Sequence, residues 1–204
     1  MFPVFLKLAG RAVLVVGGGP VASSKLDGLV AAQADITVVA PEVTEAIRRS
    51  GVRVEQRPFR DSDLDGVWYV VAAATPEVNA LVAKAAGVRR VFVNAVDDPP
   101  NATAYLGGVV RRGAAAIAIS TGGRAPALAG LLREGIDALL PDRATLESWA
   151  DEGDALKVTW RATGVPMEAR RAQMAGVIAR AYCGRMPSCD QRSAEQSHGS
   201  DDPV

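Results

Sequence analysis

An apolar run leads into a glycine-rich loop at Ala12-Val13-Leu14-Val15-Val16-Gly17-Gly18-Gly19-Pro20-Val21-Ala22. A short, continuous apolar run is typical of a parallel strand that is covered on both faces. The loop fits the pattern G-x-G-x-x-A between this strand and a predicted helix. In that pattern the first glycine makes the tight turn, the second lets the backbone approach a pyrophosphate, and the small third residue lets helix and strand pack closely. The pattern therefore predicts a dinucleotide site whose phosphates lie on the helix N-terminus.

Strands and helices are predicted to alternate along the first hundred residues. This alternation implies right-handed βαβ units around an open parallel sheet. The fold class is therefore α/β, with a Rossmann-type parallel sheet made of one mononucleotide-binding half and most of a second. The strands are expected at 12–16, 36–40, 52–56, 67–74 and 91–96, and the helices at 21–32, 42–50 and 76–86.

The pattern changes after Pro99. Two β-like runs, 103–111 and 115–120, are separated by a short glycine-containing turn and predict a hairpin. A helix then begins near Pro126, because proline is favoured in a first turn, and ends at Pro141. Two or three more helices are expected within 142–183, with a break near 164–166. The helix before Pro141 has one apolar stripe, formed by Leu128, Leu131, Leu132, Ile136, Leu139 and Leu140.

Composition excludes several classes of protein. Basic and acidic residues number 23 each, so we expect neither nucleic acid nor a membrane surface as a partner. No apolar run approaches the roughly 20 residues that cross a bilayer, and the N-terminus lacks the basic region and cleavage pattern of a signal peptide. The two cysteines form no disulfide framework. A cytoplasmic protein is therefore expected.

Other common chemistries lack their motifs. No tyrosine is followed four residues later by lysine, which argues against the short-chain dehydrogenase mechanism, and no P-loop pattern is present. The only histidine, His198, lies in a predicted tail, which argues against a histidine triad or zinc site. One stretch, 155–185, has six basic residues against one acidic residue. It predicts either a site for a polyanionic ligand or a solvated helix face.

Two positions at the expected carboxyl edge of the sheet are candidates for cofactor contact. Glu42 follows the second strand, where it either reaches the ribose hydroxyls or simply starts a helix. No arginine directly follows that strand, which favours NAD over NADP. Thr75 ends the fourth strand, where it either contacts the ligand or caps the next helix, with Asn79 one turn further on.

Two later motifs are candidates for chemistry on the substrate. Asp97 and Asp98 end the fifth strand, where a carboxylate either accepts a proton during hydride transfer, ligates a metal, or only begins a turn before Pro99. The segment 120–124 forms either a second anion site, in which Arg124 pairs with a carboxylate, or a capped turn. Its residues are Ser120, Thr121, Gly122, Gly123 and Arg124.

Together these motifs resemble the precorrin-2 dehydrogenase and sirohydrochlorin ferrochelatase family, which is also the N-terminal module of siroheme synthase. The resemblance runs from about Val4 to Pro141. It rests on Phe5-Leu6-Lys7-Leu8, Val15-Val16-Gly17-Gly18-Gly19, Val38-Val39-Ala40-Pro41-Glu42, Asn94-Ala95-Val96-Asp97-Asp98-Pro99 and Ile119-Ser120-Thr121-Gly122-Gly123-Arg124-Ala125-Pro126-Ala127-Leu128.

The resemblance implies NAD-dependent oxidation of precorrin-2 to sirohydrochlorin in siroheme synthesis. Some members also insert ferrous iron, which is then a substrate rather than a bound cofactor. Asp97 would act in dehydrogenation and as a transient metal contact, and 120–124 would lie at the tetrapyrrole cleft, with Thr121 at a position that can be a phosphorylatable serine. The residues expected to bind NAD are Gly17, Gly19, Pro20, Val21, Ala22, Pro41, Glu42 and Thr75.

The resemblance also suggests how the chain is divided. The family is homodimeric, with an intertwined interface after the nucleotide-binding domain, and the apolar stripe from Leu128 to Leu140 suits that role. We therefore expect an NAD-binding Rossmann domain (1–112), a dimerisation segment (113–141), a C-terminal helical domain (142–185) and a disordered tail (186–204).

The sequence departs from the family at two places beside the cleft. Aspartates that usually follow the fourth strand are missing from Ala74-Thr75-Pro76-Glu77, and the segment 104–108 lacks the usual Phe and Pro. Chelation is therefore less well supported than dehydrogenation. One alternative is a non-catalytic NAD(H) sensor that acts through its dimer interface. Another is a chelatase with a decayed nucleotide site, against which the intact glycine loop argues.

Overall fold

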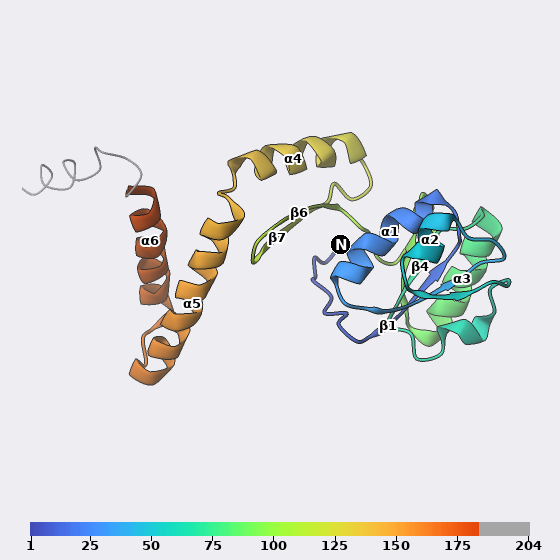
Figure 1. Cartoon of the computed structure of the whole chain (residues 1–204), viewed down its shortest axis with the longest axis horizontal. Helices are drawn as coiled ribbons and strands as arrows, with labels where there is room; N and C mark the ends of the chain where they lie inside the picture. Colours follow the sequence, from blue (N-terminus) through green and yellow to red (C-terminus); the bar gives the residue numbers. More distant parts are fainter. Residues whose placement is uncertain (184–204) are drawn as a thin grey trace, which may run out of the picture. The chain divides into compact units, whose positions relative to one another are not determined.

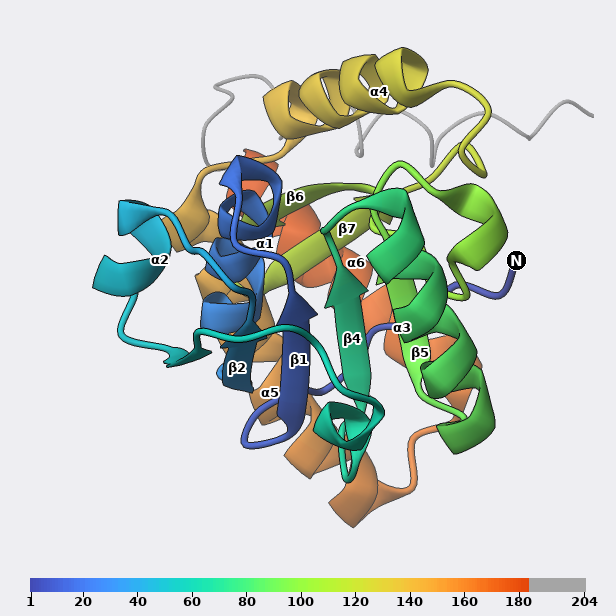
Figure 2. The same ribbon diagram turned by 90° about the vertical axis from the view of Figure 1, so that its right-hand side faces the viewer.

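The N-terminal half of the chain is built on a five-stranded parallel sheet, as predicted. In the computed structural model, which describes residues 1–183, the strands lie in the order β3-β2-β1-β4-β5. The chain starts at β1, moves outward to β3, then returns to the other side of β1 for β4 and β5, so the strand order reverses beside β1 (Figure 2). The strands are β1 (Ala12–Val16), β2 (Asp35–Val39), β3 (Arg53–Glu55), β4 (Tyr69–Ala72) and β5 (Phe92–Ala95).

Helices cover both faces of this sheet. Side chains alternate between the faces along each strand, so an apolar strand such as β1 needs a covering layer on each side. On one face Val13 and Val15 of β1 share a core with residues of α1 (Pro20–Ala31) and α2 (Glu45–Arg49), including Leu26 and Ile47. On the other face Leu14 and Val16 share a core with residues of α3 (Pro76–Arg89) and the 3-10 helix η1 (Asp61–Leu64), including Val82 and Leu64. β1 is therefore buried on both sides, as its continuous apolar run indicated.

From Gly108 to Cys183 the described chain contains a two-stranded hairpin and three α-helices (Figure 1). Arg112 fixes the hairpin to the end of α4, because its guanidinium donates to the Leu140 carbonyl at 2.7 Å and to Asp137 Oδ1 at 2.6 Å. The turn at Gly113 has a φ of 55°, and a Cβ there would lie 2.9 Å from the Arg143 carbonyl oxygen. These elements are β6 (Gly108–Arg112), β7 (Ala115–Ile119), α4 (Pro126–Leu139), α5 (Arg143–Thr163) and α6 (Met167–Cys183).

The described chain divides into two compact units. One comprises Met1–Gly107 with Ser120–Ala129, and the other comprises Gly108–Ile119 with the described residues after Ala129. The predicted tail, 186–204, and His198 lie outside the described residues. No helix within residues 1–183 is long and apolar enough to cross a membrane.

The structure corrects one predicted strand. Residues 103–111 were expected to be extended, but β6 begins only at Gly108. Thr103 and Ala104 instead fold back on β5, because their backbone N–H groups both donate to the Val93 carbonyl, at 2.9 and 2.8 Å. The Thr103 hydroxyl also accepts from the Val93 N–H at 2.8 Å. A short 3-10 helix, η2 (Pro99–Asn101), precedes this turn.

The predicted apolar stripe lies on α4 except for Leu140, which follows the helix, and most of its leucines are exposed. Leu131 is 66% exposed and Leu139 is 83% exposed, whereas Ala129 is buried. Exposed apolar side chains in this number are uncommon on a surface that faces only water. The face of α4 that carries Leu131 and Leu139 is therefore a candidate contact surface.

Candidate dinucleotide site

The glycine loop is packed against two neighbouring strand ends. Gly17 has a φ of 126°, and a Cβ on it would overlap the carbonyl oxygen of Ala73 after β4. A Cβ on Gly18 would overlap the carbonyl oxygen of Glu42 after β2. Both positions therefore require glycine, the first for its backbone conformation and for space, the second for space alone.

Gly19, in contrast, faces open space. A Cβ on it would meet nothing within 4 Å. Gly19 is the N-cap residue of α1, with extended backbone angles, and no side chain forms a capping hydrogen bond there. The first N–H groups of a helix carry partial positive charge and need an acceptor. An uncapped N-terminus with free room in front of Gly19 fits a pyrophosphate.

The loop after β2 borders the glycine loop. The backbone N–H of Thr44 donates to the Gly18 carbonyl at 2.8 Å, and the N–H of Gly17 donates to the Val39 carbonyl at 3.0 Å. The side chains of Pro41 and Glu42 are exposed at this border. Glu42 is therefore near the glycine loop with an exposed side chain, and its contact with a ribose stays a prediction.

The junction between β4 and α3 is closed by its own side chains. The Thr75 hydroxyl accepts from the Val78 N–H at 3.5 Å, so Thr75 is placed as the helix cap. Asn79 Oδ1 accepts from the Ala74 N–H at 3.0 Å. The backbone N–H of Glu77 and the Thr75 hydroxyl hold the pKa of the Glu77 carboxyl below its ordinary value. A negative charge of the protein itself thus lies at the N-terminus of α3.

Asp97 lies just past the carboxyl end of β5, in the left-handed region with a φ of 55°. The preceding residue, Val96, donates its N–H to the Ala72 carbonyl at 2.9 Å, so this turn lies beside the end of β4. Asp98 accepts from Asn101 Nδ2 at 2.8 Å and precedes η2, which is the turn that the sequence offered as an alternative. The Asp97 carboxylate has no hydrogen bond or ion pair among the described residues, so it is available to a ligand.

The segment 120–124 forms a glycine turn into α4. Thr121 Oγ1 accepts from the Ala125 N–H at 3.2 Å and donates to the Ala125 carbonyl at 3.0 Å. Ser120 Oγ accepts from the Gly122 N–H at 3.2 Å. Both hydroxyls thus serve the turn, whereas the Arg124 guanidinium has no ion pair within residues 1–183. Gly122 and Gly123 both have positive φ, at 68° and 76°.

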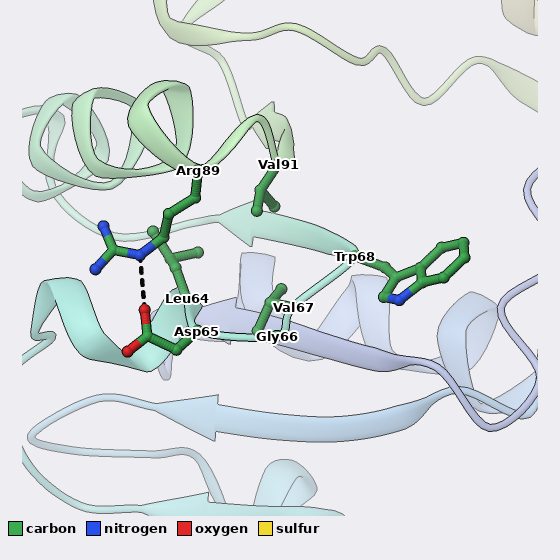
Figure 3. A pocket seen from close by; sticks show the side chains of 7 residues that line it. All are labelled: Leu64, Asp65, Gly66, Val67, Trp68, Arg89 and Val91. Atoms are coloured by element: carbon green, nitrogen blue, oxygen red, sulfur yellow. Dashed lines mark hydrogen bonds and ion pairs between the residues drawn. The ribbon is translucent and has the colours of Figure 1, made fainter.

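A hollow of about 420 Å³ opens at the opposite edge of the sheet, before β4 (Figure 3). Arg89 Nε donates to Asp65 Oδ1 at 2.8 Å, so the two charged side chains that line this hollow already pair with each other. Ligands of open α/β sheets bind at the carboxyl ends of the strands. This hollow is therefore separate from the candidate site. It is lined by Leu64, Asp65, Gly66, Val67, Trp68, Arg89 and Val91.

Two features of the site were not evident from the sequence. The pattern G-x-G-x-x-A leaves its second position open, yet Gly18 is fixed by the Glu42 carbonyl. The bond from Ala74 to Asn79 was also unforeseen, although Asn79 had been noted as one turn into the helix. The run of three glycines is a sequence signal for the close contact at Gly18. A single asparagine gives little signal for the bond between Ala74 and Asn79. Within the described chain no three His, Cys, Asp or Glu side chains are grouped to hold a metal ion.

Comparisons with known proteins identify the family of this chain. The model of a family described as putative NAD(P)-binding matches residues 4–108, and that of the central part of sirohaem biosynthesis proteins matches 113–139. "Siroheme synthase 3" of Aeromonas hydrophila is 43% identical over 144 residues, and the siroheme synthase of Xylella fastidiosa is 42% identical over 148 residues. These alignments cover 68% and 70% of this chain but 31% of each relative, so the chain spans about a third of their length.

A solved structure titled "SirC, precorrin-2 dehydrogenase" is also similar. It has a TM-score of 0.66 and 26% sequence identity, and the match covers 87% of this chain and 89% of that chain. The Rossmann-type fold and the use of a nicotinamide dinucleotide, both predicted from the sequence, are thereby confirmed. The chain belongs to the family described as putative NAD(P)-binding, and over 144 residues it is similar to a siroheme synthase.

Proposed function

We propose that this protein oxidises precorrin-2 to sirohydrochlorin with NAD as the oxidant, in siroheme synthesis. The observation that carries the proposal is the uncapped N-terminus of α1 behind the open space at Gly19, on the same sheet edge as the unpaired Asp97. Similarity to siroheme synthases and to a precorrin-2 dehydrogenase supports the choice of substrate. The alternative of a non-catalytic sensor is not favoured by these relatives.

The residues of the site divide the work of binding and reaction. The N–H groups of Val21 and Ala22 bind the pyrophosphate, while Pro20 has no N–H and only sets the first turn. The Glu42 carboxylate accepts hydrogen bonds from a ribose. When bound, NAD supplies the hydride acceptor. The Asp97 carboxylate accepts the proton that the substrate loses in the same oxidation, so the products are sirohydrochlorin, NADH and one proton.

The substrate carries several carboxylates, and the segment 120–124 supplies a cation for them. Arg124 has no ion pair within the described chain, and a guanidinium binds a carboxylate through two parallel hydrogen bonds. The hydroxyls of Ser120 and Thr121 hold the turn that presents Arg124. The positive φ of Gly122 and Gly123 makes that turn possible.

Insertion of ferrous iron into sirohydrochlorin is a second candidate activity. Iron is here a substrate, and the unpaired Asp97 carboxylate is a suitable transient contact for it and for the protons released from the ring nitrogens. The homodimer belongs to the proposal as well, since the exposed leucines of α4 offer a contact surface. Two cysteines without a disulfide framework favour a cytoplasmic location.

The test is anaerobic incubation of the purified protein with precorrin-2 and NAD. NADH and sirohydrochlorin should form in equal amounts, as followed by absorbance, and added ferrous iron should then yield siroheme if the second activity is present. Asp97→Ala should lose turnover while NADH binding remains, whereas the neighbouring Asp98→Asn should retain turnover. No NADH despite demonstrated NAD binding would reject the dehydrogenase in favour of the sensor.

A further inference from the structure

The topology assigns the two halves of the dinucleotide to different strands. β2 and β4 lie on opposite sides of β1. In the proposed site the pyrophosphate lies on α1, directly after β1, and Glu42 after β2 binds the ribose of the adenosine half. The nicotinamide half then lies on the other side of β1, beside β4. The junction between β4 and α3 is then its binding surface, and this inference rests on the function proposed above.

Asn79 is the buried polar side chain at this junction, with 3% of its surface exposed. The Ala74 N–H donates to Asn79 Oδ1 at 3.0 Å. Because a backbone N–H can only donate, the oxygen of the Asn79 amide faces the loop and the nitrogen points elsewhere. The preceding carbonyl, that of Ala73, lies directly against Gly17. Asn79 is therefore linked to the first glycine of the phosphate loop through a single peptide unit.

The amide nitrogen of Asn79 has no partner. It makes no hydrogen bond within residues 1–183, and it is not among the fully buried atoms without a partner, which in residues 1–107 are the hydroxyls of Thr44 and Tyr69. Asn94, the other buried asparagine of the described chain, donates its amide nitrogen to the Ala104 carbonyl at 3.1 Å. Because the unpaired Asn79 nitrogen is not fully buried, it remains accessible and can donate to an acceptor on a bound ligand.

The charge at this junction indicates which acceptor fits. Glu77 places a carboxylate at the N-terminus of α3, so the junction repels a phosphate. A neutral oxygen, such as a ribose hydroxyl or a carboxamide oxygen, meets no such repulsion and accepts from an amide N–H. The nicotinamide nucleoside carries both kinds of oxygen.

We propose that Asn79 is a binding residue for the nicotinamide half of the dinucleotide. Its Oδ1 holds the Ala73–Ala74 peptide against the glycine loop, and its Nδ2 donates to an oxygen of the nicotinamide nucleoside. The adenosine half and the pyrophosphate make no use of Asn79.

The test compares two ligands on the full chain. NADH contains both halves, whereas ADP-ribose lacks the nicotinamide ring. Asn79→Asp keeps an oxygen for Ala74 but removes the N–H donor, and Asn79→Ala removes both. The matched control is Thr103→Val, which deletes another side-chain oxygen that accepts from a backbone N–H, in the segment after η2. Dissociation constants come from fluorescence titration, and folding is monitored by thermal melting of each variant.

In Asn79→Asp, NADH affinity should fall by about tenfold or more, with ADP-ribose affinity within about twofold of the unmodified protein. Thr103→Val should melt earlier but bind both ligands normally. Equal NADH binding by all variants, or equal loss of both ligands in Asn79→Asp, would overturn the role of Asn79. Failure of the unmodified protein to bind either ligand would instead overturn the proposed function together with this inference.

Discussion

Two strand–helix junctions, β1–α1 and β4–α3, lie at the same edge of the sheet. Both helices begin in a similar way, but only the N-terminus of α3 is capped by side chains of the protein. Both helices carry proline at the first turn. At α1 the N-cap residue is Gly19, and no side chain caps the helix. At α3 the N-cap residue is Thr75, which bonds to Val78, and Glu77 adds a carboxylate. One N-terminus is open to an external anion, while the other is occupied by the protein itself.

A βα turn alone therefore does not make a phosphate site. The N-terminal partial charge is common to all helices, so its availability depends on whether a cap or an acid satisfies it first. Three residues at each junction, Gly17–Gly19 and Thr75–Glu77, decide that outcome. The following substitutions alter one junction at a time.

The largest effect is expected for Gly18→Ala. Its Cβ would overlap the Glu42 carbonyl, so the glycine loop and the loop after β2 must separate. The free energy of unfolding, measured by urea denaturation, should fall by about 3 kcal/mol, and NADH binding should be lost. Gly28→Ala, inside α1 with open space around it, is the control and should stabilise by about 0.5 to 1 kcal/mol. Normal NADH binding by Gly18→Ala would contradict the packing described here.

Gly19→Ala should separate binding from folding. Its backbone angles, φ −83° and ψ −174°, suit any residue, and the added methyl group meets no protein atom. The free energy of unfolding should change by less than about 0.5 kcal/mol. The methyl group would fill the space in front of α1, so NADH affinity should fall by about tenfold or more, as measured by fluorescence titration. Unaltered affinity would show that the phosphates bind elsewhere.

Thr75→Ala removes the cap of α3 without touching the glycine loop. The Val78 N–H loses its acceptor, so the free energy of unfolding should fall by about 1 kcal/mol in urea denaturation. Thr75→Ser keeps the hydroxyl and should restore most of that loss. If Thr75→Ala were as stable as the unmodified protein, the hydroxyl would not act as a cap.

The smallest effect is expected for Glu77→Gln, and it should depend on pH. The pKa of Glu77 is lowered in the fold, so its charged form stabilises the protein above the ordinary pKa of 4.5, and this contribution is lost as the pH falls through the lower, folded value. Glu77→Gln should thus melt slightly earlier than the unmodified protein at pH 7, and the difference should shrink as the pH is lowered below 4.5. A constant difference across this range would point to a cause other than charge.

The sequence by itself determined the elements and the type of site. The predicted strand 12–16 matches β1, and the predicted helix 76–86 begins at Pro76 as observed. Apolar runs, glycines and prolines act on the backbone within a few residues, so their effects can be read from near neighbours. The dinucleotide loop was recognised for the same reason, because its pattern lies within six consecutive residues.

Only the tertiary structure decided which residues support that loop. Gly18 is fixed by Glu42, Gly17 by Ala73, and Ala74 by Asn79. The first two contacts join loops that follow different strands, and they exist because β2 and β4 pair with β1 on opposite sides. The return of Thr103 onto Val93 of β5, which replaces the start of the predicted strand 103–111, is also a tertiary contact. Contacts of this kind depend on strand pairing, which places distant segments together and leaves no periodic signal in either of them.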